Sequence, residues 1–313
     1  MALVTERLRE KGIARNAILR QTALRGAEIF ALGLLFRVQE FALGYRSAPW
    51  TDLLRVDILN ILGLSMILMS LVCWLTAAPE IRAARFRGIV GSLIAATAIA
   101  MATPPLWTTH RPNWLPWPLE SYINGVHIYH QPQVWLFPLF PWSAVAFAGL
   151  AIGFLLYTPL ARRREALFFL LLAVCGVVAC LLSQIFDASP MHLYAVYDYW
   201  HSSPNFLLMR CGILLIVLFL AYAWSRWSFA QAGFSPLVQL GKTSLLVYWV
   251  HIEFVYGGFA ILPKRACSIA KATFGLLLIF LAMLGLSILR TRFKKGRIKV
   301  SQPVARPVSA PAT

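Results

Sequence analysis

The sequence has few charged residues, and acidic residues are the scarcer sign. Charged side chains make up 13% of its 313 residues, and only 12 of these residues are Asp or Glu. A soluble globular domain carries about twice that share of charge, so the composition excludes an ordinary soluble domain. Hydrophobic residues make up 59% of the chain instead. We therefore predict that most side chains face lipid.

Metal ligands and nucleotide-binding loops are also missing from the sequence pattern. None of the five cysteines has the spacing of a metal ligand, and four of them lie in apolar stretches where a small buried side chain is expected. The chain contains no glycine-rich phosphate-binding motif and no internal repeat. We therefore predict no metal site.

Eight apolar stretches approach the length of about 20 residues that a membrane-spanning helix needs. We predict an all-α fold, a polytopic membrane helix bundle of about eight transmembrane helices. Residues 1–25 form a basic cytoplasmic arm, residues 26–289 the transmembrane domain, and residues 290–313 a basic, disordered cytoplasmic tail. The predicted spans are 26–44, 56–77, 89–107, 136–157, 167–186, 207–224, 237–257 and 270–289.

The basic residues predict how these spans are oriented. With both termini in the cytoplasm, 21 of the 29 Lys and Arg residues lie on the cytoplasmic side, six on the outer side and two within spans. Short cytoplasmic loops carry such an excess, so we predict that both termini are cytoplasmic. The basic residues on the cytoplasmic side then explain the net charge of +17. The expected partner is therefore the lipid bilayer rather than nucleic acid.

Ionisable side chains inside the spans are the main signal for a functional site. Each costs on the order of 2.5–3.5 kcal/mol at a helix centre unless it is paired or faces water. A mutually paired buried network and a polar active site both explain them, and we favour the active site. The candidate catalytic residues are His251, Arg37, Arg210, Asp57 and Glu253, and the candidate substrate-binding residues are Glu40, Asn60, Ser203, Ser244, Tyr248 and Trp249.

The seventh predicted span contains the most informative pattern. Gly241, Ser244, Tyr248 and His251 are spaced to share one helix face, while Glu253 lies on another face with Trp249. His251 fits a general base or a donor to a carbonyl oxygen. A histidine that bridges two helices fits the spacing equally well.

Three stretches make the chain similar to a known family. They are Leu24-Arg25-Gly26, the segment 54–60 followed by Leu62-Gly63, and the segment 241–253. The chain resembles the multi-span acyltransferases related to heparan-α-glucosaminide N-acetyltransferase, including uncharacterised bacterial members. The resemblance implies a multi-pass protein of a bacterial inner membrane that transfers an acyl group from cytosolic acetyl-CoA, or another acyl-CoA, to a sugar amine or hydroxyl on the far side. A homodimer is also compatible with it.

The same resemblance has consequences for the residue roles. Arg25, Arg163 and Lys242 are the candidate residues for the phosphates of the coenzyme, although the positive-inside rule explains such residues without a ligand. Family members usually begin with about two further spans, which carry the histidine credited with the chemistry, and we expect this chain to lack them. A transporter of a small polar or anionic solute and a non-catalytic truncated family member are the alternative functions.

Overall fold

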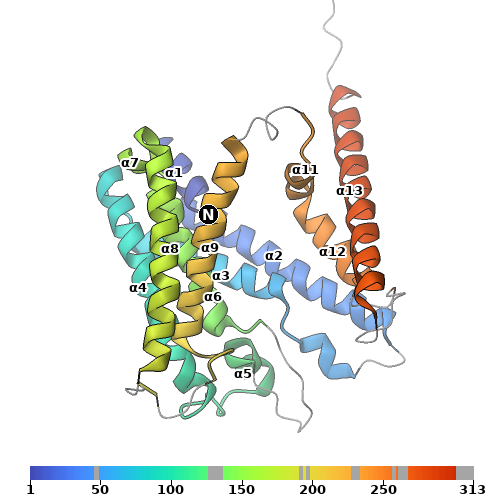
Figure 1. The fold of residues 1–313 in the computed structure, drawn as a ribbon, viewed down its shortest axis with the longest axis horizontal. Helices are drawn as coiled ribbons and strands as arrows, with labels where there is room; N and C mark the ends of the chain where they lie inside the picture. Colours follow the sequence, from blue (N-terminus) through green and yellow to red (C-terminus); the bar gives the residue numbers. More distant parts are fainter. Residues whose placement is uncertain are drawn as a thin grey trace, which may run out of the picture. The chain divides into compact units, whose positions relative to one another are not determined.

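The computed structural model is helical throughout the part of the chain that it describes, and no strand occurs in that part (Figure 1). It divides into two compact units, each described here by itself: Met1–Phe41 with Ala48–Trp227, and Ala42–Ser47 with Ser228–Thr313. The described residues are 1–45, 49–125, 137–189, 193–194, 198–226, 233–255, 259 and 267–300, the last seven by their backbone alone.

The first unit is a bundle of helices. The connections between its long helices differ in length, from a few residues to the segment 108–138. The elements are α1 (Ala2–Glu10), α2 (Arg15–Leu43), η1 (Trp50–Leu54), α3 (Ile58–Leu75), α4 (Ile81–Trp107), α5 (Trp117–Asn124), α6 (Leu139–Leu155), α7 (Pro159–Arg163), α8 (Glu165–Ala188) and α9 (Pro204–Arg226). The last residues of α2, from Ala42 onward, are grouped with the second unit.

Five described helical segments are long and apolar enough to cross a membrane, which confirms a multi-pass helical membrane protein. They are Trp50–Leu75, Ile81–Trp107, Glu165–Ala188, Pro204–Arg226 and Ile269–Phe293. The other three predicted spans correspond to α2, which carries charged residues along its length, and to the shorter apolar helices Leu139–Leu155 and Ser244–Val255. The count of eight and the cytoplasmic location of the termini remain predictions. Leu136 and Gly257, at two of the predicted span ends, lie outside the described residues.

Two helix pairs show how closely the bundle packs. In the α8/α9 pair, a Cβ added to Gly176 would lie 2.6 Å from the Gly212 carbonyl oxygen, and the reverse holds for Gly212. Only a residue without a side chain allows the two backbones to approach so closely. On the other side of the unit, Phe154 of α6 is fully buried and packs in a cluster with Met69 and Cys73 of α3.

The predicted N-terminal arm is folded. Residues 2–10 form α1, in which Ala2, Thr5 and Glu6 are buried, and α2 already begins at Arg15. The basic residues of this region are therefore held in two helices, except Lys11, which lies in the turn between them.

The second unit contains α11 (Pro236–Lys242), α12 (Ser244–Val255) and α13 (Ile269–Val300). A polar ladder joins α11 to α13: the Gln239 amide donates to the hydroxyl oxygens of Ser287 and Thr291, each at 3.0 Å. Helix α13 continues through residues 290–300, where the sequence predicts a disordered tail, and residues 301–313 lie outside the described part.

The expected continuous helix through residues 241–251 is interrupted. Thr243 leaves helical geometry, with φ −125° and ψ 27°, and its hydroxyl donates to Ser287 Oγ at 2.6 Å. This contact with α13 ends α11 and starts α12 in a new direction. The prediction that Gly241 shares one helix face with Tyr248 and His251 is therefore wrong, because Gly241 belongs to a different helix.

Candidate functional site

A buried ion pair joins the α2/α3 pair. Arg37 of α2 donates from Nε and Nη2 to Asp57 Oδ2, at 3.2 and 2.5 Å, and its Nη1 lies 2.5 Å from Glu40 Oε2. The side chains of Arg37 and Asp57 are 6% and 5% exposed, whereas Glu40 is 25% exposed. The structure thus brings together three of the residues that the sequence singled out. Two carboxylates surround one guanidinium, so the charge of Arg37 is compensated.

The helices approach each other closely beside this pair. A Cβ added to Gly63 of α3 would lie 2.6 Å from both the carbonyl oxygen of Gly26 and the backbone nitrogen of Phe30 in α2. One turn further along, the Asn60 amide donates to the Phe30 carbonyl oxygen at 3.1 Å. The missing side chains of the two glycines therefore allow the side chains of α2 and α3 to interdigitate at this level.

Asp57 is also the N-cap residue of α3. Its Oδ1 accepts from the Ile58 amide at 2.5 Å, while Asn60 Oδ1 accepts from the Asp57 amide at 3.2 Å, which completes a capping box. Asp57 and Asn60 thus have structural partners, and these contacts alone would explain the two residues.

Tyr122 of α5 lies at the same end of the bundle. Its ring is 5.9 Å from that of Phe30, and burial raises the pKa of Tyr122 to about 12, an effect that Arg37 opposes and Asp57 strengthens. The phenol stays protonated at neutral pH and is available as a hydrogen-bond donor or acceptor.

Arg210 of α9 lies on the other side of an aromatic group from the Arg37 pair. Its guanidinium is 4.6 Å from the Trp142 ring centroid and 4.0 Å from that of Phe206, and it donates to the Trp200 carbonyl oxygen at 3.2 Å. Trp142 in turn packs in the cluster around Val56, next to Asp57. The aromatic rings hold Arg210 by cation–π contacts, and no carboxylate among the described residues pairs with it.

The structure adds a histidine–aspartate pair that the sequence did not single out. His201 Nδ1 and Asp198 Oδ2 form a hydrogen bond, and Asp198 Oδ1 accepts from the Trp200 amide at 2.9 Å. Burial opposes ionisation of Asp198, but these hydrogen bonds outweigh it and lower its pKa. An ionised carboxylate only accepts, so His201 donates from Nδ1, and in a neutral ring Nε2 is then the acceptor. The spacing Asp-x-x-His was the available signal in the sequence.

The turn that carries this pair continues into α9. The amides of Ser202 and Ser203 both donate to the Asp198 carbonyl oxygen at 2.9 Å. Ser203, a predicted substrate-binding residue, is buried, and its hydroxyl accepts from the Asn205 amide nitrogen at 3.1 Å. The His201 ring stacks on Trp107 of α4, with centroids 6.5 Å apart. The pair is thus fixed to both α4 and α9, while His201 itself remains 55% exposed.

The remaining predicted catalytic and substrate-binding residues belong to the second unit. His251 Nδ1 lies 3.0 Å from the Val247 carbonyl oxygen, a geometry in which Nδ1 donates and Nε2 accepts, and its ring meets that of Tyr248 edge-on at 5.7 Å. Glu253 is 4% exposed. Ser244 and Trp249 lie on α12 with them. Their roles in catalysis or substrate binding stay predictions.

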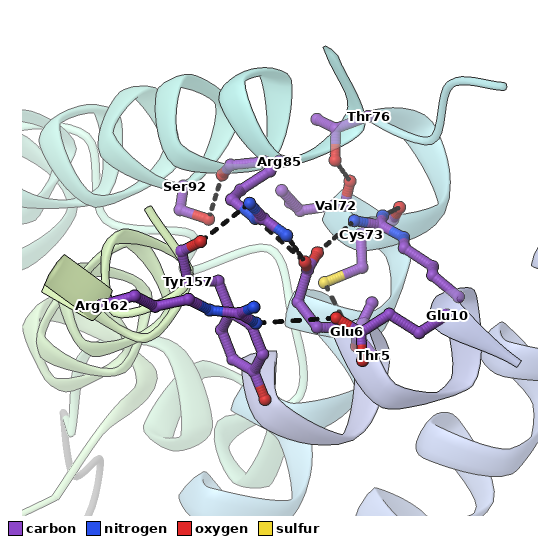
Figure 2. Close-up of polar contacts among 12 residues, drawn as sticks. Thr5, Glu6, Glu10, Val72, Cys73, Thr76, Arg85, Ser92, Tyr157 and Arg162 are labelled. Atoms are coloured by element: carbon purple, nitrogen blue, oxygen red, sulfur yellow. Dashed lines mark hydrogen bonds and ion pairs between the residues drawn. The ribbon is translucent and has the colours of Figure 1, made fainter. Parts of the chain in front are cut away.

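A second polar cluster occupies the opposite end of the first unit, where α1 meets α4 and α6. Figure 2 shows the Glu6 carboxylate beside the Arg85 guanidinium, which donates to it from Nε at 3.0 Å and from Nη2 at 2.6 Å. Arg85 also donates to the Tyr157 carbonyl oxygen, and Arg9 lies 3.3 Å from Glu6 and donates to the Cys73 carbonyl oxygen. Glu6 is fully buried, so we assign this cluster to holding α1 in place.

A cavity of about 220 Å³ lies beside this cluster, lined in part by Arg9, Arg15 and Trp74. The Arg15 guanidinium lies 5.0 Å from the centroid of the Trp74 ring and makes no ion pair with a described residue. The predicted phosphate-binding residues do not line this cavity. Arg25 pairs with Glu28 at 2.7 Å, Arg163 ends α7, and Lys242 ends α11 in the second unit. No group of metal ligands occurs among the described residues.

Comparison with known proteins identifies the family of the chain. Residues 4–182 match the family model of the heparan-α-glucosaminide N-acetyltransferase catalytic domain. None of the curated proteins matches the chain. The matched segment covers more than half of the chain and contains most of α1, all of α2 to α7, most of α8, the Arg37 pair and the Glu6 cluster. The chain therefore belongs to the heparan-α-glucosaminide N-acetyltransferase catalytic domain family, and it is a multi-pass membrane protein of acetyltransferase type.

Proposed function

We propose that the protein transfers an acetyl or other acyl group from acyl-CoA to a hydroxyl or amine of a sugar on the other side of the membrane. The observation that carries this proposal is the family match over residues 4–182. Two features of the first unit support it. One is a cavity near one end with an arginine that makes no ion pair with a described residue, and the other is a cationic, aromatic site with a histidine–aspartate pair near the other end.

The donor end is the end that carries the Glu6 cluster, which we place in the cytoplasm. Arg15 offers its guanidinium at the cavity, and Trp74 offers a flat ring beside it. A guanidinium binds phosphate through paired N–H groups, and an aromatic face stacks on a base. Arg9 is already engaged with Glu6, so Arg15 is the residue that fits a phosphate of the coenzyme.

The acceptor end contains the residues for the transfer step. His201 Nε2 takes the proton of the acceptor hydroxyl or amine, while Asp198 holds the ring and stabilises its positive charge. The acceptor atom attacks the thioester carbonyl carbon, the C–S bond breaks, and the thiolate of CoA leaves and takes up a proton. Arg210 stabilises the negative charge on the carbonyl oxygen. His251, predicted from the sequence, is the alternative base.

Transfer of radiolabelled acetyl from acetyl-CoA to a panel of amino sugars and neutral oligosaccharides tests the proposal on the purified full chain. We expect the variant His201→Gln to lower the rate about 10²–10⁴-fold. His110→Gln is the matched control, because His110 is an exposed histidine that hydrogen-bonds to Thr109 and has no acidic partner among the described residues. This variant should retain the wild-type rate.

The same assay separates the two histidines. Loss of transfer in His251→Gln with full activity in His201→Gln would assign the base to α12 and overturn the role of the Asp198 pair. No transfer by the wild-type chain to any acceptor would contradict acyl transfer itself.

A further inference from the structure

A large cavity lies within the first unit, between the α4/α6 pair and the α8/α9 pair. Its volume is about 1080 Å³, at the upper end of the range of about 300–1,000 Å³ for small-molecule sites. Helices α4, α8 and α9 are long and apolar enough to span the membrane. The cavity therefore runs along the membrane-spanning part of the bundle.

The middle of the cavity is apolar. Small residues of α4 and α6, among them Ala100, Ala148 and Gly149, face Leu214 and Leu215 of α9. The cavity is open on one side, since Leu93, Phe186 and Leu214 of its lining are exposed, and a water molecule in it would need two to four polar partners. The described walls offer almost no polar partners in this part. A hydrocarbon chain therefore suits this part of the cavity better than water.

Polar side chains gather at one end of the cavity, where α8 ends and α9 begins. Ser189, Tyr194, Ser203 and Asn205 line this end. The Tyr194 hydroxyl donates to the Met101 carbonyl oxygen at 2.6 Å and keeps its own oxygen available as an acceptor. The side-chain amide of Asn205 is half-buried and has no hydrogen-bond partner among the described residues. An amphiphile is therefore oriented with its head at this end.

The side chains at the polar end of the cavity indicate which lipid head group fits there. All the described residues that line the cavity are uncharged, so no arginine or lysine among them is placed to hold a phosphate. Serine, tyrosine and asparagine are the donors and acceptors that suit hydroxyl groups. Ser203 also joins this end to the turn of Asp198 and His201 through its amide.

We propose that the cavity binds one hydrocarbon chain of a neutral glycolipid, a glycosyl diacylglycerol, whose sugar contacts Asn205 and Tyr194. The chain lies between the two helix pairs and the sugar lies beside the Asp198 turn. Binding at this cavity is independent of the proposed acyl transfer, because it requires neither acyl-CoA nor a base.

Native mass spectrometry of the purified full chain, with monoglucosyl diacylglycerol added, tests the proposal. The probe variant is Gly149→Leu: a Cβ at this position meets no atom within 4 Å, so the side chain enters the cavity without a clash. Gly285→Leu is the matched control, since Gly285 of α13 has the same open surroundings and does not line the cavity. We expect one bound glycolipid in the wild type and the control, and at least tenfold weaker binding in Gly149→Leu.

A second variant addresses the head group and does not depend on how Gly149→Leu folds. Asn205→Ala should weaken monoglucosyl diacylglycerol binding about fivefold and leave the binding of phosphatidylglycerol with the same chains unchanged. The wild type should prefer the glycolipid over phosphatidylglycerol. Equal retention of glycolipid by wild type and Gly149→Leu, or no bound lipid in the wild type, would overturn the cavity assignment. Equal binding of both lipids by the wild type would overturn the neutral head group.

Discussion

At the scale of single residues, the two arginines of the site differ in how their charge is compensated. Arg37 is buried between two carboxylates, whereas Arg210 is held by aromatic rings and a carbonyl oxygen. A buried charge with a full set of partners tolerates the loss of a partner poorly, because the remaining charge stays buried alone. Arg37 therefore contributes mainly to stability. Arg210 has no carboxylate partner among the described residues, so its charge can interact with a substrate.

Arg37→Met should lower the free energy of unfolding by about 3–5 kcal/mol, because the Asp57 carboxylate is left buried without its cation. The double variant Arg37→Met/Asp57→Asn should recover at least half of this loss, since Asn is neutral and is still a good helix cap. Thermal unfolding in detergent measures both. If the double variant is no more stable than Arg37→Met, the Asp57 charge is not the cause of the loss.

The Asp198 pair should make stability depend on pH. The folded pKa of Asp198 is lowered, so its contribution is present above the unfolded pKa of about 3.9 and is lost as pH falls through the folded value. Asp198→Asn should therefore melt at a lower temperature than the wild type at pH 7. The difference should shrink as the pH is lowered toward 3. A difference that does not change between these pH values would show that the carboxylate charge is not responsible.

At the scale of helices, glycine residues lie where neighbouring helices approach most closely. Gly26 and Gly63 set the approach of α2 to α3, and Gly176 and Gly212 set that of α8 to α9. By contrast, Gly149 faces an open cavity. The same residue type thus occupies two opposite packing environments in one bundle.

Gly63→Ala should lower the free energy of unfolding by about 1–3 kcal/mol or more, because the new methyl group meets backbone atoms of α2 at 2.6 Å. Gly149→Ala is the matched control. Its methyl group enters open space, and alanine favours a helix over glycine by about 1 kcal/mol, so its melting temperature should stay equal or rise. Equal destabilisation of the two variants would mean that the contact between α2 and α3 does not govern stability.

At the scale of the whole molecule, the two ends of the first unit differ in chemistry. Glu6, Arg9 and Arg85 lie at the end where α4 begins, and the Arg37 pair and His201 lie at the end where α4 finishes. We place the first end in the cytoplasm, in agreement with the predicted excess of basic residues there.

Labelling with a membrane-impermeant maleimide tests this orientation. In a chain whose native cysteines have been replaced by serine, Arg163→Cys at the end of α7 should be labelled only after the cells are permeabilised. Thr109→Cys, just beyond α4, should be labelled in intact cells. The opposite pattern would reverse the topology and move the proposed acceptor site to the cytoplasm.

Much of the fold could be predicted from the sequence, because a helix that crosses the membrane needs about 20 mostly apolar residues. The apolar runs predicted the helices that cross the membrane. The cost of buried charge singled out Arg37, Glu40 and Asp57, which the structure brings together as a paired network, although the sequence analysis favoured an active site over such a network. The break at Thr243 could not be predicted, since it depends on Ser287, which is 44 residues away. The pair of Asp198 and His201 was missed because these residues lie in a loop. Charged side chains in loops do not pay the free-energy cost of burial in the membrane, so nothing in the sequence marks them as unusual.

The buried Glu6 carboxylate also constrains the order in which the chain assembles. Its partner Arg85 follows 79 residues later, on α4. During synthesis, Glu6 is made long before that arginine exists, and its charge has to stay in water until α3 and α4 have been inserted as a hairpin. Helix α1 therefore docks onto the bundle only after α4 is in place, although it precedes α4 in the chain.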